Sequence, residues 1–126
     1  MNEEFVPYDL SIKLKEKGFH ETCFAQYFPA CKKTELRFNN DLNNMYVGAP
    51  TIGQVLEWFR RKHGLHVEFA CDASGYMFIV SDVPSKGGTD RYYSNYSGPN
   101  DAGTWDEYED CAFAAIGYVL NNLIRP

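Results

Sequence analysis

The sequence predicts a single domain of the α+β class, in which one antiparallel sheet of four to five strands packs with three helices. Three observations predict this class. A helical segment with signals at both ends lies near the middle of the chain, paired apolar stretches with turn residues between them lie before and after it, and a longer helical segment follows. The expected order is α-β-β-α-β-β-(β)-α. The length of 126 residues suits one domain, so we assign residues 1–126 to it.

The first elements are a short helix over residues 8–17, which Gly18 ends, and a hairpin. Aromatic and alternating residues predict strands over residues 23–28 and 33–39, because the four-residue link between them is short enough for a hairpin. Residues 39–50 contain many Asn, Gly and Pro residues and are therefore expected to form a long loop.

The central helix has the clearest signals. Thr51 and Gln54 form a capping box, and an apolar stripe at helical spacing follows, made by Ile52, Val55, Leu56 and Phe59. Gly64 comes after three cationic residues and is typical of the left-handed residue that ends a helix.

A second strand pair follows over residues 65–71 and 76–82, joined by the turn formers 72–75. Residues 83–104 form the longest weakly patterned segment, in which residues 91–96 favour a fifth, edge strand. Thr104 and Glu107 form a second capping box, which predicts the last helix over residues 105–123.

The apolar stripe of this last helix is wider than a half-buried helix needs. Two arrangements would bury this stripe equally well. It packs either against the sheet together with the first or central helix, or against a second copy of the chain in a two-fold homodimer.

The composition is that of a folded protein, with 44% apolar, 16% aromatic and 23% charged residues. No apolar run has the length of a membrane span, and the acidic start of the chain differs from a signal peptide. We therefore expect a cytoplasmic protein that does not bind membranes.

The net charge of −5 is concentrated in the C-terminal half, where three Lys and Arg residues after His66 face nine Asp and Glu residues. Sequence-independent nucleic-acid binding depends on a basic surface, so this charge balance argues against it and favours a protein partner.

No cofactor or metal is expected. The four cysteines, Cys23, Cys31, Cys71 and Cys111, form no C-x-x-C pair and suit buried apolar positions in a reducing compartment. His63 and His66 have the spacing of a ligand pair, but Gly64 between them changes the backbone from helix to strand.

A tyrosine cluster among small polar residues, as in a binding paratope, gives the candidate partner-binding residues Arg91, Tyr92, Tyr93 and Tyr96. The alternative is an ordinary edge strand, because tyrosine favours strands. If the cluster binds a partner, Tyr93→Ala and Tyr96→Ala weaken that contact and leave folding intact.

Several segments resemble a family of short hypothetical proteins of Bacteroides-group gut bacteria and their phages and prophages. The segments are residues 5–8, 14–19, 23–25, 49–51 and 58–65. The family has no assigned activity and no catalytic residues. The resemblance implies a bacterial or phage-infected cytoplasm, in which small acidic accessory proteins bind a host or phage protein.

These observations together favour a non-enzymatic protein-interaction protein. The alternative is a small enzyme whose Cys/His or carboxylate site is formed by the loops 39–50 and 83–104. No motif in the sequence specifies a reaction.

Overall fold

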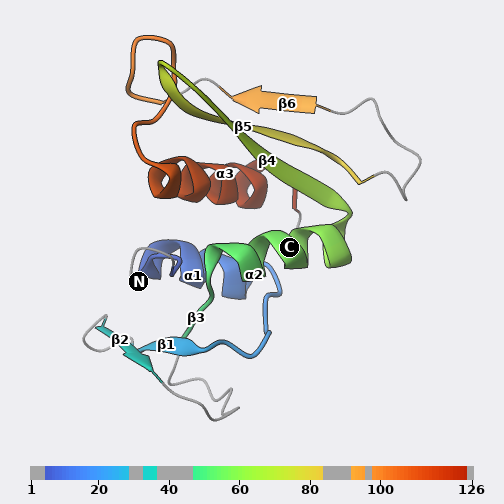
Figure 1. Ribbon diagram of the computed structural model, residues 1–126. Helices are drawn as coiled ribbons and strands as arrows, with labels where there is room; N and C mark the ends of the chain where they lie inside the picture. The colour runs from blue at the N-terminus through green and yellow to red at the C-terminus, as the bar shows by residue number, and fades with distance from the viewer. Residues whose placement is uncertain (1–4, 29–32, 37–46, 84–91, 96–97, 125–126) are drawn as a thin grey trace. The chain divides into compact units, whose positions relative to one another are not determined.

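The structure is a computed structural model that describes residues 5–28, 33–36, 47–83, 92–95 and 98–124 (Figure 1). Residues 28, 33–36 and 92–95 are described by their backbone. The α+β class is confirmed. The described elements are, in order, α1 (Tyr8–Glu16), β1 (Ala25–Phe28), β2 (Lys33–Leu36), β3 (Val47–Ala49), α2 (Ile52–Trp58), a π-helical turn (Phe59–His63), β4 (Leu65–Asp72), β5 (Gly75–Asp82), β6 (Tyr92–Asn95) and α3 (Tyr108–Asn122).

The chain divides into two compact units. The first unit contains residues 1–52 and 117–126, and the second unit contains residues 53–116. The division passes through the start of α2 and through α3. Each unit has its own sheet.

The described strands form two three-stranded antiparallel sheets, with the orders β2-β1-β3 and β4-β5-β6. The single sheet of four to five strands is not confirmed. Each predicted hairpin instead pairs with a third strand of its own unit. In the first unit this strand is β3, which lies in the expected loop 39–50 and pairs with β1 from Ala25↔Ala49 to Tyr27↔Val47.

The core of the first unit lies between its sheet and α1. Ala25, Tyr27, Val47 and Ala49 form a buried cluster, and the Tyr8 ring meets the Tyr27 ring edge-on at 5.6 Å. The carbonyl of Val6 accepts hydrogen bonds from the Tyr27 hydroxyl at 2.8 Å and from a second buried hydroxyl, that of Ser11, at 3.2 Å. These two buried hydroxyls are therefore paired, as burial requires.

The last part of α3 belongs to the first unit and is joined to α1 by two lysines. Lys13 donates to the side-chain oxygen of Asn121 at 3.2 Å, and Lys17 donates to the carbonyl of Ile124 at 3.0 Å. The sequence left two interpretations of what packs on the wide apolar stripe of this helix. These contacts support the first interpretation, in which another helix of the same chain packs on it.

The second unit begins with a helix that ends where the sequence predicts. Gly64 follows the π-helical turn with φ 67°, in the left-handed region that favours glycine. Trp58 and Phe59 are fully buried at the junction of α2 and the turn, and the Trp58 ring meets the His63 ring edge-on at 4.7 Å. The π-helical turn itself has no signal in the sequence.

The hairpin of β4 and β5 follows the prediction closely, with pairs that run from Leu65↔Asp82 to Asp72↔Gly75. The expected edge strand 91–96 is present in part as β6, whose partner among the described strands is β5. Among the described residues, no helix combines the length and the apolar character that a membrane span requires.

Candidate protein-interaction surfaces of the second unit

The structure places two of the four candidate residues on an edge strand. Tyr92 lies opposite Ser81 and Tyr93 lies opposite Val80 in the pairing of β6 with β5. Arg91 and Tyr96 lie outside the described residues. Directly opposite residues of an antiparallel pair share one face of the sheet, so Tyr92 and Tyr93 belong to opposite faces.

The two faces of this sheet differ in burial. On the inner face, the side chains of Leu65, Val67, Phe78 and Val80 are buried, and α3 lies along this side (Figure 1). The outer face alternates with it along the same strands: Glu68 and Ala70 are exposed, whereas Met77 and Ile79 are half-buried. In the backbone register, Tyr93 is opposite Val80 of the inner face, and Tyr92 is opposite Ser81 of the outer face.

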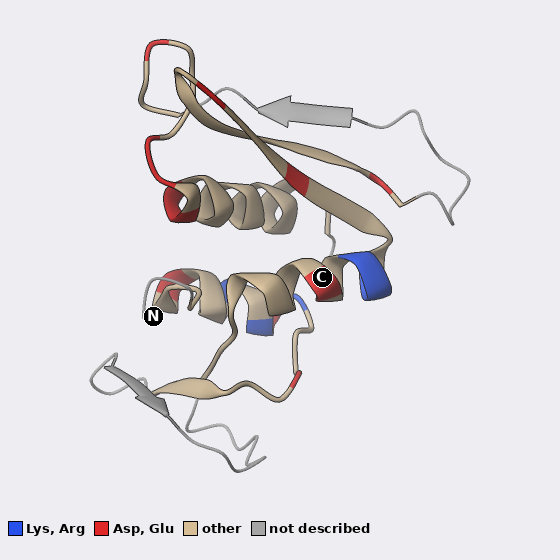
Figure 2. Cartoon of the chain, viewed as in Figure 1, with Lys and Arg blue, Asp and Glu red and all other residues tan. Residues whose placement is uncertain are grey.

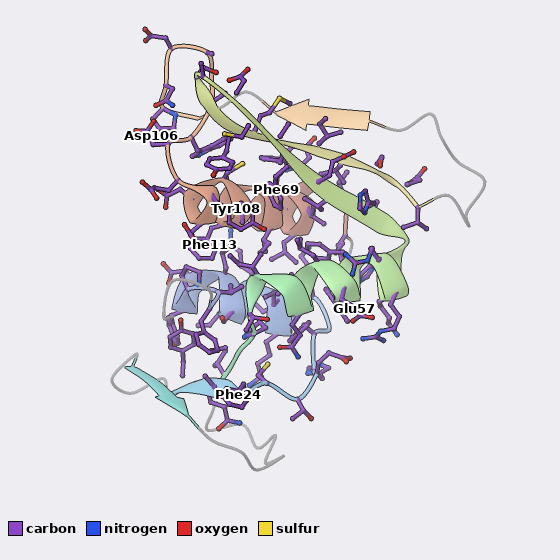
Figure 3. The ribbon with its side chains drawn as sticks, viewed as in Figure 1. Phe24, Glu57, Phe69, Asp106, Tyr108 and Phe113 are labelled. Carbon is purple, nitrogen blue, oxygen red and sulfur yellow. The ribbon has the colours of Figure 1, made fainter. Side chains whose placement is uncertain are left out.

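A cluster of half-buried aromatic rings lies at the end of the inner face where α3 begins. The Tyr108 ring contacts the Phe69 ring at 5.0 Å and the Tyr76 ring at 5.9 Å, with interplanar angles of 68° and 77°. Figure 3 shows Tyr108 of α3 and Phe69 of β4 side by side. We call these three residues the aromatic cluster.

The tip of the hairpin is fastened to the segment before α3. The carbonyl of Ser74 accepts from the Thr104 hydroxyl at 2.6 Å and from the Asn100 amide at 2.8 Å, and the Asn100 amide also donates to the Asp106 carboxylate at 2.9 Å. Trp105 pairs with the backbone of Tyr76 through two hydrogen bonds of 2.7 and 2.9 Å.

The second predicted capping box, formed by Thr104 and Glu107, is therefore wrong. Thr104 does not cap α3, because its hydroxyl donates to the hairpin tip and α3 begins only at Tyr108. The Thr104 hydroxyl donates its hydrogen bond to the carbonyl of Ser74, 30 positions away, and not to a group at the start of the helix, as the local pattern predicts.

The described cations of the second unit gather at one end of it, whereas acidic residues occur at both ends (Figure 2). Its described cations are all in the π-helical turn before β4: Arg60, Arg61 and Lys62. Arg61 is paired with Glu57 at 3.0 Å. Near the hairpin tip and the start of α3 the charged residues are acidic, and the exposed ones are Asp72, Asp101, Asp106, Glu107 and Asp110.

Two of the described cysteines have protonated thiols. Burial, and then the charge of Glu21, raises the pKa of Cys23 to about 12, and burial raises the pKa of Cys111 to about 11. Both thiols stay neutral at physiological pH, and only a thiolate is a good nucleophile or metal ligand.

His63 and His66 have structural positions at the end of the helical segment and in β4. His63 packs its ring on Trp58, and His66 lies opposite Ser81 on the outer face. Within the described ranges, no group of three or more His, Cys, Asp or Glu residues is placed to hold a metal ion.

The aromatic cluster was not found by sequence reasoning, because its members come from β4, β5 and α3 and are brought together only by folding. The exposed carboxylates around Tyr108 are visible in the sequence, but there they indicate the start of a helix. The chain matches no protein-family description, no curated protein and no solved structure.

Proposed function

We propose that this chain is a non-enzymatic accessory protein that binds a protein partner through the outer face of its second sheet. The observation that carries the proposal is the pair of half-buried apolar side chains, Met77 and Ile79, on a sheet face that no helix of the described second unit covers. Apolar side chains at the centre of a face with polar ones around them are typical of interaction sites.

The neighbours of these two residues suit such a contact. His66 and Glu68 provide polar groups beside them on β4, and the register of β6 with β5 pairs Tyr92 with Ser81 of the same face. Tyrosine gives a large contact area at low entropic cost. The backbone of an edge strand can also pair with a strand of a partner, which adds affinity without a pocket.

Two of the described thiols bear on one form of the alternative enzyme. A Cys/His site needs a cysteine thiolate, and the raised pKa values of Cys23 and Cys111 oppose the formation of a thiolate at these two residues.

The test is affinity capture from the native host with the wild-type chain and three variants. Ile79→Lys and Tyr92→Ser alter the outer face, whereas Phe24→Ser removes an exposed aromatic ring, 54% exposed, from the first unit. The proposal requires a partner that the wild type and Phe24→Ser retain and that both outer-face variants lose. Circular dichroism verifies that each variant is folded.

Identical sets of captured proteins from all four chains would refute the proposal. If Phe24→Ser also loses the partner, capture depends on nonspecific binding through exposed apolar groups. This result too would contradict a specific outer-face contact.

A further inference from the structure

We infer that the free edge of β4 pairs with β4 of a second copy of this chain, antiparallel and about a two-fold axis at Phe69. The sheets of the two second units then form one continuous sheet. The inference does not depend on the proposed function, because it uses an edge of the sheet, whereas the proposed partner contacts the outer face.

The backbone of β4 is open along one side. β4 lies at the end of the order β4-β5-β6, so β5 is its neighbour among the described strands. The carbonyl of Gly64 accepts from the amide of Val83 at 3.0 Å, and by alternation the even-numbered residues of β4 direct their backbone groups to β5. Val67, Phe69 and Cys71 direct theirs outward, and within the described part of the chain these groups have no backbone partner.

This edge lacks several features that usually prevent strand pairing. Edge strands of native proteins are commonly protected by proline, by a β-bulge or by lysine side chains. β4 contains no proline and no lysine, and its register with β5 runs without a bulge. The side chains of Glu68, Ala70, Cys71 and Asp72 are exposed. A strand of a second chain can therefore reach the second half of β4.

Charge complementarity selects the register. Antiparallel pairing about a two-fold axis places outward-directed residues opposite one another. An axis at Glu68 would place two carboxylates directly opposite each other, which is unfavourable. With the axis at Phe69, Glu68 lies opposite Ala70 of the second copy and His66 lies opposite Asp72, so no like charges face one another. An axis nearer the start of β4 would leave its exposed second half unpaired.

The chemistry of His66 and Asp72 suits this pairing. One oxygen of the Asp72 carboxylate accepts from the Ser74 amide at 2.8 Å and from the Ser74 hydroxyl at 2.6 Å. These bonds hold the carboxylate at the end of the strand. Its second oxygen is an acceptor, and an imidazole N–H of the second copy is a donor.

The charges at the two ends of β4 match in the same arrangement (Figure 2). Arg60, Arg61 and Lys62 are exposed in the π-helical turn before β4. Asp72 and Asp101 are exposed at the hairpin tip, to which Asn100 is bonded. Antiparallel pairing brings the cationic turn of each copy toward the acidic tip of the other, whereas parallel pairing would bring the two cationic turns together. The charges therefore favour the antiparallel orientation.

Sedimentation velocity of the full chain over a range of concentrations measures this self-association. We expect a reversible change from one copy to two, which weakens as salt is added. Ala70→Lys places a cation opposite Glu68 of the second copy, and the two-fold axis forms this pair twice. It should strengthen the dimer roughly two- to thirtyfold. Ala70→Glu should weaken the dimer, because like charges then lie opposite each other.

Cys71→Pro tests the backbone pairing. It removes an outward N–H that the dimer uses twice, whereas the amides that bond β5 remain. The dimer should weaken roughly fivefold or more. Circular dichroism verifies that each variant is folded, and if Cys71→Pro does not fold, the two Ala70 variants decide.

Two sets of controls complete the design. Gly53→Lys and Gly53→Glu repeat the changes in net charge at an exposed position of α2, where an added Cβ meets no atom within 4 Å. The affinities of these two variants should differ far less than those of the two Ala70 variants. Tyr92→Ser alters the outer face without changing the net charge, and it should dimerise as the wild type does.

Two results would overturn the inference. The first is a chain that stays monomeric at near-millimolar concentration, which would leave the edge of β4 for a strand of another protein. The second is a dimer whose affinity the Ala70 variants change no more than the Gly53 variants do, which would place the contact on another surface.

Discussion

Gly75, at the tip of the second hairpin, provides a quantitative test of how that tip is held. Its φ is 131°, and a Cβ at this position would lie 2.5 Å from the Trp105 carbonyl oxygen and 2.9 Å from the Thr104 hydroxyl. For Gly75→Ala, the backbone strain costs about 1–3 kcal/mol. Overpacking against a backbone atom adds about 1–3 kcal/mol. The lower entropy of the unfolded chain offsets only about 0.4–1 kcal/mol. We therefore expect a net loss of about 1–6 kcal/mol in the free energy of unfolding.

The matched control is Gly53→Ala. Gly53 is exposed in α2, and a Cβ added there would meet no atom within 4 Å, so alanine should stabilise the helix by about 0.5–1 kcal/mol. Urea unfolding followed by circular dichroism measures both variants. For a slope of about 2 kcal/mol per molar urea, Gly75→Ala should lower the midpoint by about 0.5–3 M. A midpoint for Gly75→Ala at or above that of the wild type would refute the reasoning.

Two further predictions concern titratable groups. Hydrogen bonds from the Ser74 hydroxyl and amide lower the pKa of Asp72 below 3.8. The ionised carboxylate therefore stabilises the turn above that pH, and this stabilisation is lost as pH falls through the lowered value. A carboxyl-shift titration by NMR should show a higher pKa in Ser74→Ala; equal values would contradict the assignment. In thiol labelling at pH 8 with peptide mapping, exposed Cys71 should react rapidly, and buried Cys23 and Cys111 should react only after unfolding. Rapid labelling of either buried thiol in the folded chain would disprove their raised pKa.

Signals that depend on a few neighbouring residues predicted the structure well. Gly64 ends the central helix in the left-handed conformation, as its position after three cations indicates. The second hairpin has nearly the expected bounds, since the turn formers between Cys71 and Tyr76 fix where the chain reverses. Such signals succeed because the backbone preferences of those residues decide the local conformation directly.

Features that depend on distant partners were missed. The local pattern assigned Thr104 to the start of α3, but the carbonyl of Ser74 accepts its hydrogen bond. The third strand of the first sheet is β3, three residues long, whose pairing with β1 no local pattern indicates. The candidate tyrosines were found from composition, but only the register with Ser81 and Val80 separates Tyr92 from Tyr93.

The π-helical turn affects how this chain tolerates changes in its length. Trp58 and His63 are five positions apart, about 1.4 turns of a regular α-helix, and yet their rings touch because the wider turn accommodates one surplus residue. Deleting one residue between them would restore regular winding, with Gly64 still able to end the helix. We therefore expect the segment before the second hairpin to tolerate the loss of one residue without a shift in the strand register that follows.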